Sequence, residues 1–225
     1  AIEKSGVHIH LNTSIGTDLS FDDMRSQSDA IYIAAGTQAS RLLDIPGEEL
    51  EGVESGVGFL KRVGLKKDLS VPKHLVVIGG GSTAIDVART AVRLGSEQVT
   101  VVYRRTEQEM PAGREEVEEA REEGIEIISL ASPLEFVGAD GKVTGVHLIR
   151  RRIAEFGSDG RRLTKQLQGS NFTIDCDGVV TAINQDVDHK VYRTTNVGMD
   201  KTGKLEINKY TRQTAEKGIF AGGDV

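Results

Sequence analysis

The chain has 225 residues, of which 38% are hydrophobic and 28% are charged, a composition typical of a globular protein with a buried core. Its formal net charge of −6 argues against nucleic acid or an anionic lipid surface as a partner. No apolar run approaches the ~18 residues needed to cross a membrane, and no signal peptide is visible, so we expect a cytoplasmic protein. The single cysteine, Cys176, excludes an internal disulfide, a dithiol centre and a cysteine-held cluster within this sequence.

The N-terminal part predicts two strands and two short helices. Gly6–Asn12 alternates like a strand, and Asp29–Gly36 is an almost wholly apolar strand of the buried parallel type. Ser20–Met24 resembles a short capped helix between them, and Val57–Lys61 begins another helix. His8 and His10 share a face of the first strand, but no third ligand accompanies them, so we expect no metal there.

The centre of the chain carries the pattern of a dinucleotide-binding βαβ unit. An apolar run that ends at Ile78 enters a three-glycine turn. A helix is predicted from Ser82 to about Leu94, where Gly95 stops it, and a second apolar run, Val99–Val102, follows. A glycine triplet alone would indicate only a tight turn, but strand, turn, helix and second strand together favour a nucleotide site.

The glycine turn fits the Gly-x-Gly-x-x-Gly/Ala fingerprint. Gly79 and Gly81 stand at its first two positions and Ala84 at the third. The free N–H groups at the start of the following helix, and the helix dipole, favour a pyrophosphate at this place. The residues predicted to bind the nucleotide here are Gly79, Gly80, Gly81, Ser82, Thr83 and Ala84.

The end of the second strand indicates which nucleotide is bound. Enzymes that use the unphosphorylated cofactor place Asp or Glu roughly 20 residues beyond the glycines, whereas this chain has Tyr103 followed by Arg104 and Arg105. A carboxylate would repel a 2′-phosphate, and guanidinium groups pair with it. The arginines therefore predict NADP; the alternative is a solvated arginine pair at a strand end.

The remainder predicts one more helix and several strands. Gly113–Glu123 is predicted as a helix with a solvated charged face, and Ala139–Lys142 as the turn of a hairpin. Phe156–Asn171 is predicted as a polar loop. The predicted strands are Ile125–Leu130, Leu134–Val137, Val143–Arg151 and Val179–Ile183.

Several motifs together resemble the two-dinucleotide flavoproteins, and specifically the family of the glutamate synthase small (β) subunit. The resemblance covers essentially the whole chain. Its most specific string is Arg-Arg-x-Glu-x-Glu-Met-Pro-Ala, which ends at Ala112. The matching segments are Ala34–Thr37, Ile45–Glu48, Gly79–Asp86, Tyr103–Ala112, Asp159–Arg162, Gly169–Phe172 and Gly218–Asp224.

The resemblance implies an α/β fold: a Rossmann-like NAD(P)-binding domain with a parallel sheet, helices and a small antiparallel β-meander, together with parts of an FAD domain. It implies a partial FAD-binding domain and linker over residues 1–70, an NADPH-binding domain over 71–190, and a return to the FAD domain over 191–225. Asp224 would bind a ribityl hydroxyl of the flavin. Asp86 either faces the nicotinamide, as an acidic residue there does in relatives, or is a first-turn carboxylate stabilised by the helix dipole.

The implied activity is hydride transfer from NADPH to FAD, with electrons passed to a partner subunit. The cofactors carry this chemistry, so no catalytic side chain or metal is assigned. The family's FAD glycine fingerprint and cysteine-rich segment would lie upstream of this sequence, and the family's crossover glycine is Asn184 here. We therefore expect a piece of a longer protein that is inactive alone. The alternative function is a nucleotide-binding or electron-relay subunit without turnover of its own.

Overall fold

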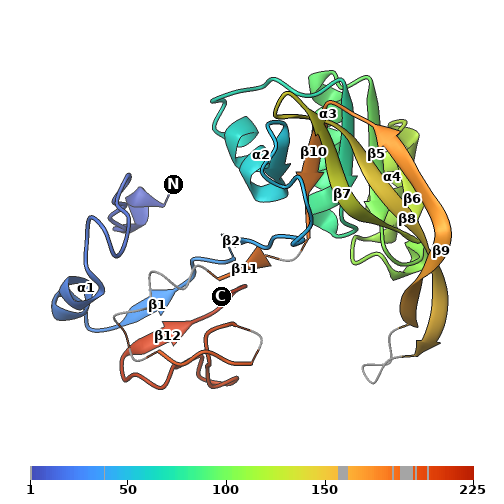
Figure 1. Ribbon diagram of the computed structural model, residues 1–225. Helices are drawn as coiled ribbons and strands as arrows, with labels where there is room; N and C mark the ends of the chain where they lie inside the picture. Colours follow the sequence, from blue (N-terminus) through green and yellow to red (C-terminus); the bar gives the residue numbers. More distant parts are fainter. Residues whose placement is uncertain are drawn as a thin grey trace. The chain divides into compact units, whose positions relative to one another are not determined.

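The computed structural model describes residues 2–37, 39–156, 162–183, 185–187, 195, 197–201 and 203–225 (Figure 1). The chain forms two compact units, one of Ser40–Asn184 and one of Ala1–Ala39 together with Gln185–Val225. Four of the motif positions named from the sequence lie outside the described residues: 159–161 and Asn184.

The larger unit is built on a five-stranded sheet whose strands are all parallel. The strand order is β3-β10-β4-β5-β6. This sheet and its helices confirm the α/β class. The strands are β3 (Val53–Ser55), β10 (Gly178–Thr181), β4 (His74–Ile78), β5 (Gln98–Tyr103) and β6 (Glu126–Ser129).

Three helices accompany the sheet. α2 (Gly56–Gly64) begins after Ser55, whose hydroxyl accepts a hydrogen bond from the Gly58 N–H at 3.1 Å. α3 (Ser82–Leu94) ends at Gly95, which has a φ of 105° and so adopts the left-handed C-cap that favours glycine. α4 (Arg114–Glu122) follows Gly113.

A three-stranded antiparallel sheet packs against the parallel one. It consists of β7 (Ala131–Ala139), β8 (Lys142–Phe156) and β9 (Arg162–Asp175). Asp140 (φ 51°) and Gly141 (φ 79°) form the β7–β8 turn; two positive φ values in succession are typical of a type I′ hairpin, so the predicted turn is confirmed.

The predicted polar loop over Phe156–Asn171 is wrong. From Arg162 onwards this segment belongs to β9, which pairs with β8. The first half of β9 is largely exposed on both faces, so its sequence has no apolar alternation to indicate a strand.

The larger unit therefore has three layers. Successive side chains of the central strands β4 and β5 point to opposite faces of the parallel sheet. Val77 and Val101 pack with the helices, whereas Val76, Ile78 and Val102 pack with the antiparallel sheet. All five are at most 4% exposed. Burial on both faces explains why β4 and β5 read as continuous apolar runs.

The smaller unit is organised around one pair of parallel strands, β1 (Ile31–Ile33) and β12 (Ile219–Ala221). α1 (Phe21–Gln27) is capped by Ser20, whose hydroxyl accepts from the Asp23 N–H at 3.0 Å, as predicted. A core that includes Phe21, Ile31 and Ile219 joins these elements. The unit also contains the short helix η1 (Glu3–Ser5).

The predicted strand over Gly6–Asn12 is not formed. These residues pair with no strand among the described parts of the chain, and the apolar side chains of Val7, Ile9 and Leu11 are exposed. Apolar alternation alone does not make a strand without a neighbour to accept its backbone hydrogen bonds. Two further two-residue strands, β2 (Ala39–Ser40) and β11 (Gln185–Asp186), lie where the chain passes between units. In the described residues, no helix has the length and apolarity to span a bilayer.

Candidate functional site

The first glycine of the loop after β4 is held in tight packing. Gly79 has a φ of 155°, and a Cβ atom added there would lie 2.3 Å from the carbonyl oxygen of Ala182 and 3.2 Å from the Cβ of Ala84. Ala84 itself is fully buried. Gly79 and Ala84 therefore allow strand and helix to approach closely.

The second glycine lies against the end of β5. A Cβ atom on Gly80 would lie 2.4 Å from the ring of Tyr103. The Tyr103 hydroxyl donates to the carbonyl of Glu109 at 2.8 Å, and the N–H of Ala112 donates to the carbonyl of Gly80 at 3.1 Å. The segment that follows β5 thus folds back onto the glycine loop.

Gly81, the last glycine of the loop, has free space beside its backbone. A Cβ atom on Gly81 would meet nothing within 4 Å, and Gly81 is the N-cap of α3 with no side chain to cap it. Within the described parts of the chain, the backbone N–H groups of Gly81, Ser82 and Thr83 donate to no acceptor. These donors and the positive end of the helix dipole form a place for an anion.

A carboxylate that the sequence analysis assigned to a solvated helix face lies beside this place. Glu116 of α4 accepts hydrogen bonds from the Ser82 hydroxyl and from the Gly113 N–H, both at 3.0 Å. In the sequence, the spacing of three residues between Gly113 and Glu116 matches a helix-capping pair, and this spacing could have indicated the position of Glu116. The folded chain therefore places a negative charge beside the glycine loop that the residues of the loop itself do not carry.

The arginine pair follows β5 directly. Arg104 is exposed and Arg105 is half-buried. Parallel pairing places Ile78 opposite Val102, so the glycine loop and the arginines leave the sheet side by side at its carboxyl edge. In the portion of the chain that is described, no carboxylate pairs with either arginine.

The loop beyond the arginines is rigidified by the short helix η2 (Glu107–Glu109). Glu109 accepts from both the hydroxyl and the N–H of Thr106, at 2.7 and 3.3 Å, in a capping box. The hydrogen bond from the Thr106 hydroxyl holds the pKa of Glu109 below its usual value, and the positive charges of Arg105 and Arg162 lower it further. The capping box therefore stabilises the conformation of the loop that follows the arginines.

The two acidic residues considered from the sequence are both exposed. Asp86 lies on α3, one turn beyond the glycines. Asp224 lies in the smaller unit, just beyond β12. Gly222 precedes it, and a Cβ atom there would lie 2.1 Å from the Tyr32 hydroxyl.

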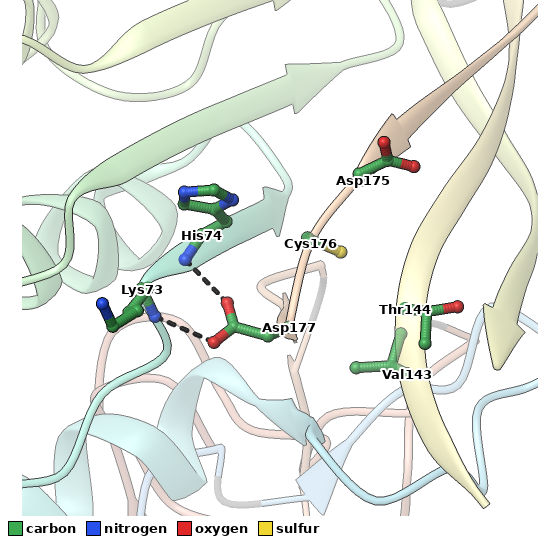
Figure 2. A pocket seen from close by; sticks show the side chains of 7 residues that line it. All are labelled: Lys73, His74, Val143, Thr144, Asp175, Cys176 and Asp177. Carbon is green, nitrogen blue, oxygen red and sulfur yellow. Dashed lines mark hydrogen bonds between the residues drawn. The ribbon is translucent and has the colours of Figure 1, made fainter. Parts of the chain in front are cut away.

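A hollow at the amino end of the parallel sheet is lined by charged residues but does not resemble a binding site (Figure 2). Asp177 uses its two carboxylate oxygens to accept from the N–H groups of Lys73 (3.1 Å) and His74 (2.7 Å). Burial raises the pKa of the neighbouring Cys176 thiol to about 12, so it stays protonated and unreactive at neutral pH. The glycine loop leaves the opposite end of β4. Among the described residues, no group of three His, Cys, Asp or Glu side chains is arranged to hold a metal ion.

Comparisons with known proteins agree with this geometry. A family model described as pyridine nucleotide-disulphide oxidoreductase matches residues 2–225. The β subunit of the NADP(+)-dependent formate dehydrogenase of Moorella thermoacetica is 36% identical over 228 residues, which cover 100% of this chain and 32% of that protein. The glutamate synthase (NADPH) small chain of Escherichia coli (strain K12) is 35% identical over 236 residues, covering 98% of this chain and 50% of that protein. The resemblance to the glutamate synthase small subunit is thereby confirmed, and the chain spans about a third to a half of the length of these two relatives.

A solved structure shares the fold. Mycobacterium tuberculosis FprA in complex with NADPH matches with a TM-score of 0.75 and 22% sequence identity, over 94% of this chain and 61% of that chain. At this identity the likeness concerns the fold alone.

Proposed function

The chain belongs to the pyridine nucleotide-disulphide oxidoreductase family, and from this premise we propose that it is the NADPH-binding part of a flavin-dependent oxidoreductase. The Ser40–Asn184 unit would bind NADPH, and the unit of residues 1–39 and 185–225 would be part of an FAD domain. When bound, NADPH supplies a hydride that FAD accepts and passes on as electrons. The electron acceptor would be a partner subunit.

One observation carries the proposal for NADPH. The open position at Gly81 and the three N–H groups of Gly81, Ser82 and Thr83 fit a pyrophosphate, because each could donate to it without breaking a hydrogen bond between described residues. A side chain would be tolerated at Gly81 by the fold, and a ligand that approaches the backbone there would account for its absence.

The two arginines would determine the preference for NADPH over NADH. Arg104 and Arg105 stand at the strand end where an acidic residue would bind an unphosphorylated ribose. Guanidinium groups donate hydrogen bonds to phosphate in pairs, and neither arginine has a described carboxylate partner to give up. We propose that they bind the 2′-phosphate of NADPH and orient the adenosine.

We propose fewer contacts of this chain with the flavin than with NADPH. Asp224 follows a parallel strand at its carboxyl end, where ligands of such sheets bind, and its exposed carboxylate could accept a hydrogen bond from a ribityl hydroxyl. The Gly222 backbone, two residues before Asp224, packs closely against the Tyr32 hydroxyl. We propose Asp224 as the flavin contact of this chain and assign no further one.

A second candidate function is a nucleotide-binding or electron-relay subunit without turnover of its own. Two relatives support it, since one is named as a β subunit and the other as a small chain. The two candidates differ in one measurement, made on the full-length protein reconstituted with FAD: an oxidoreductase would reduce an artificial acceptor at the expense of NADPH, and a passive subunit would not.

Calorimetric titration with NADP⁺ tests the shared part of the proposal. We expect the wild-type protein to bind, and Gly81→Val to lose binding while its thermal unfolding midpoint stays within a few degrees, because a side chain there fills only ligand space. Unchanged affinity of Gly81→Val would contradict the proposed pyrophosphate site. Absence of binding to the wild type would contradict the proposed function as a whole.

A further inference from the structure

The segment that carries the arginine pair is attached to the antiparallel sheet through its backbone. The hydroxyl of Thr164 on β9 donates to the carbonyl of Arg104 at 3.2 Å. The N–H of Leu130 donates to the carbonyl of Arg105 at 3.0 Å. Both arginines therefore hold their positions through residues far away in the sequence.

The same two residues hold a third arginine. Arg151 of β8 donates through Nε to the Thr164 hydroxyl at 2.8 Å and through Nη2 to the Thr164 carbonyl at 2.6 Å. Its Nη1 donates to the Ser132 hydroxyl at 3.2 Å, and its N–H donates to the Leu130 carbonyl at 2.6 Å. Thr164 and Leu130 thus each bridge Arg151 to the arginine pair.

The backbone of Leu130 is shaped for this bridge. Leu130 has a φ of 53°, which a branched side chain rarely adopts, at the junction between β6 and β7. This conformation directs its N–H toward Arg105 and its carbonyl toward the N–H of Arg151. Strain of this kind persists only where the surroundings impose it.

Among the described residues, Arg151 has a fixed position and no acidic partner. All its acceptors are neutral oxygens, and within the described residues no carboxylate pairs with it. Burial lowers the pKa of Arg151, and the nearby positive charge of Arg104 lowers it further. Arg104 and Arg151 lie near enough to repel each other electrostatically, and a bound anion would relieve this repulsion.

The orientation of Arg151 follows from the strand register. Ile153 pairs with Thr164, and Arg152 pairs with Lys165. Because strand residues alternate in direction, Arg151 and Thr164 share the face that meets Arg104, whereas Arg152 lies on the other face and is exposed.

We propose that Arg151 is a third phosphate-binding and specificity-determining residue, which contacts the 2′-phosphate of the nucleotide together with Arg104 and Arg105. The inference rests on the proposed NADPH function of this site. Thr164 and Ser132 orient the guanidinium group before the ligand arrives, so little side-chain entropy is lost on binding.

The test compares Arg151→Gln with the matched control Arg152→Gln, which removes the same charge from the opposite face of the same strand. Affinities for NADP⁺ and NAD⁺, and for 2′,5′-ADP and 5′-AMP as probes of the phosphate alone, are measured by calorimetry. Arg151→Gln should weaken NADP⁺ and 2′,5′-ADP about tenfold and leave NAD⁺ and 5′-AMP unchanged. Arg152→Gln should change all four affinities less than about twofold.

The outcomes separate the inference from the function on which it rests. If the wild type prefers NADP⁺ but Arg151→Gln matches Arg152→Gln, Arg151 is not a phosphate ligand and the NADPH function stands. An equal loss for NADP⁺ and NAD⁺ would make Arg151 a purely structural residue and also overturn the inference. If the wild type binds neither nucleotide, the proposed function itself fails. Should Arg151→Gln not fold, Arg151→Lys decides: it keeps the charge, so the ratio of NADP⁺ to NAD⁺ affinity should fall only partly, and an unchanged ratio would overturn the inference.

Discussion

The ring of Tyr103 lies against the backbone of Gly80, so closely that a Cβ atom on Gly80 would come within 2.4 Å of it. This contact joins the two halves of the candidate site, because Gly80 belongs to the glycine loop and Tyr103 immediately precedes the arginine pair. The hydrogen bond between the Ala112 N–H and the Gly80 carbonyl closes the same junction from the other side.

Adjacent glycines in this loop should respond differently to the same side chain. Gly80→Ser should cost about 1–3 kcal/mol of unfolding free energy, because its Cβ would displace the Tyr103 ring. Gly81→Ser should be neutral or should stabilise by about a few tenths of a kcal/mol, because serine is a slightly better N-cap for α3 than glycine. Urea unfolding measures both. Equal stabilities of the two variants would show that the Tyr103 contact does not constrain the loop.

Glu116 should weaken anion binding at the glycine loop. Its carboxylate accepts from Ser82, and its charge repels a phosphate placed on the free N–H groups. Glu116→Gln keeps an acceptor for the Gly113 N–H, and it should strengthen NADP⁺ and NAD⁺ binding about two- to fivefold at low salt.

The control for Glu116 is Glu115→Gln, which removes an exposed charge from the adjacent position of the same helix. Its effect on both affinities should be smaller than that of Glu116→Gln. Weaker binding by Glu116→Gln would mean that the carboxylate supports the ligand through the helix cap and does not repel it.

Much of the site could be predicted from the sequence because its parts are local. The glycine spacing, the helix that follows and the strand end at Tyr103 all lie within one βαβ unit, where register brings Ile78 next to Val102. The predicted bounds of α3 agree with the structure, since a glycine marks its end. These features depend on short-range geometry, which sequence patterns record.

The remaining parts depend on contacts between distant residues. Thr164 meets Arg104 across 60 positions of sequence, through a strand whose exposed faces carry no apolar alternation. Leu130 gives no sign in the sequence of its positive φ, because glycine or asparagine would be expected there. The position of Arg151 could therefore not be predicted without the fold.

The loop that carries the arginines should lose stability in acid. The pKa of Glu109 is lower in the folded chain than its ordinary value of 4.5, mainly because the Thr106 hydroxyl donates to it. A lowered pKa means that the carboxylate stabilises the fold above about pH 4.5 and that this contribution is lost as the pH falls through the folded value. The unfolding free energies of wild type and Glu109→Gln should therefore differ most near neutral pH and converge in acid. A difference that is independent of pH would contradict this role for the charged form.

The central claim is tested most directly by the ratio of NADP⁺ to NAD⁺ affinity, measured by calorimetry on the wild type and on the double variant Arg104→Ala, Arg105→Ala. A guanidinium–phosphate hydrogen bond contributes about 1.5–3 kcal/mol, so the wild type should prefer NADP⁺ roughly tenfold to a hundredfold. The double variant should bring the ratio close to one by weakening NADP⁺ and leaving NAD⁺ nearly unchanged, and the wild-type preference should shrink as salt rises. Equal affinities of the wild type for the two nucleotides would show that the arginine pair is only a solvated strand end.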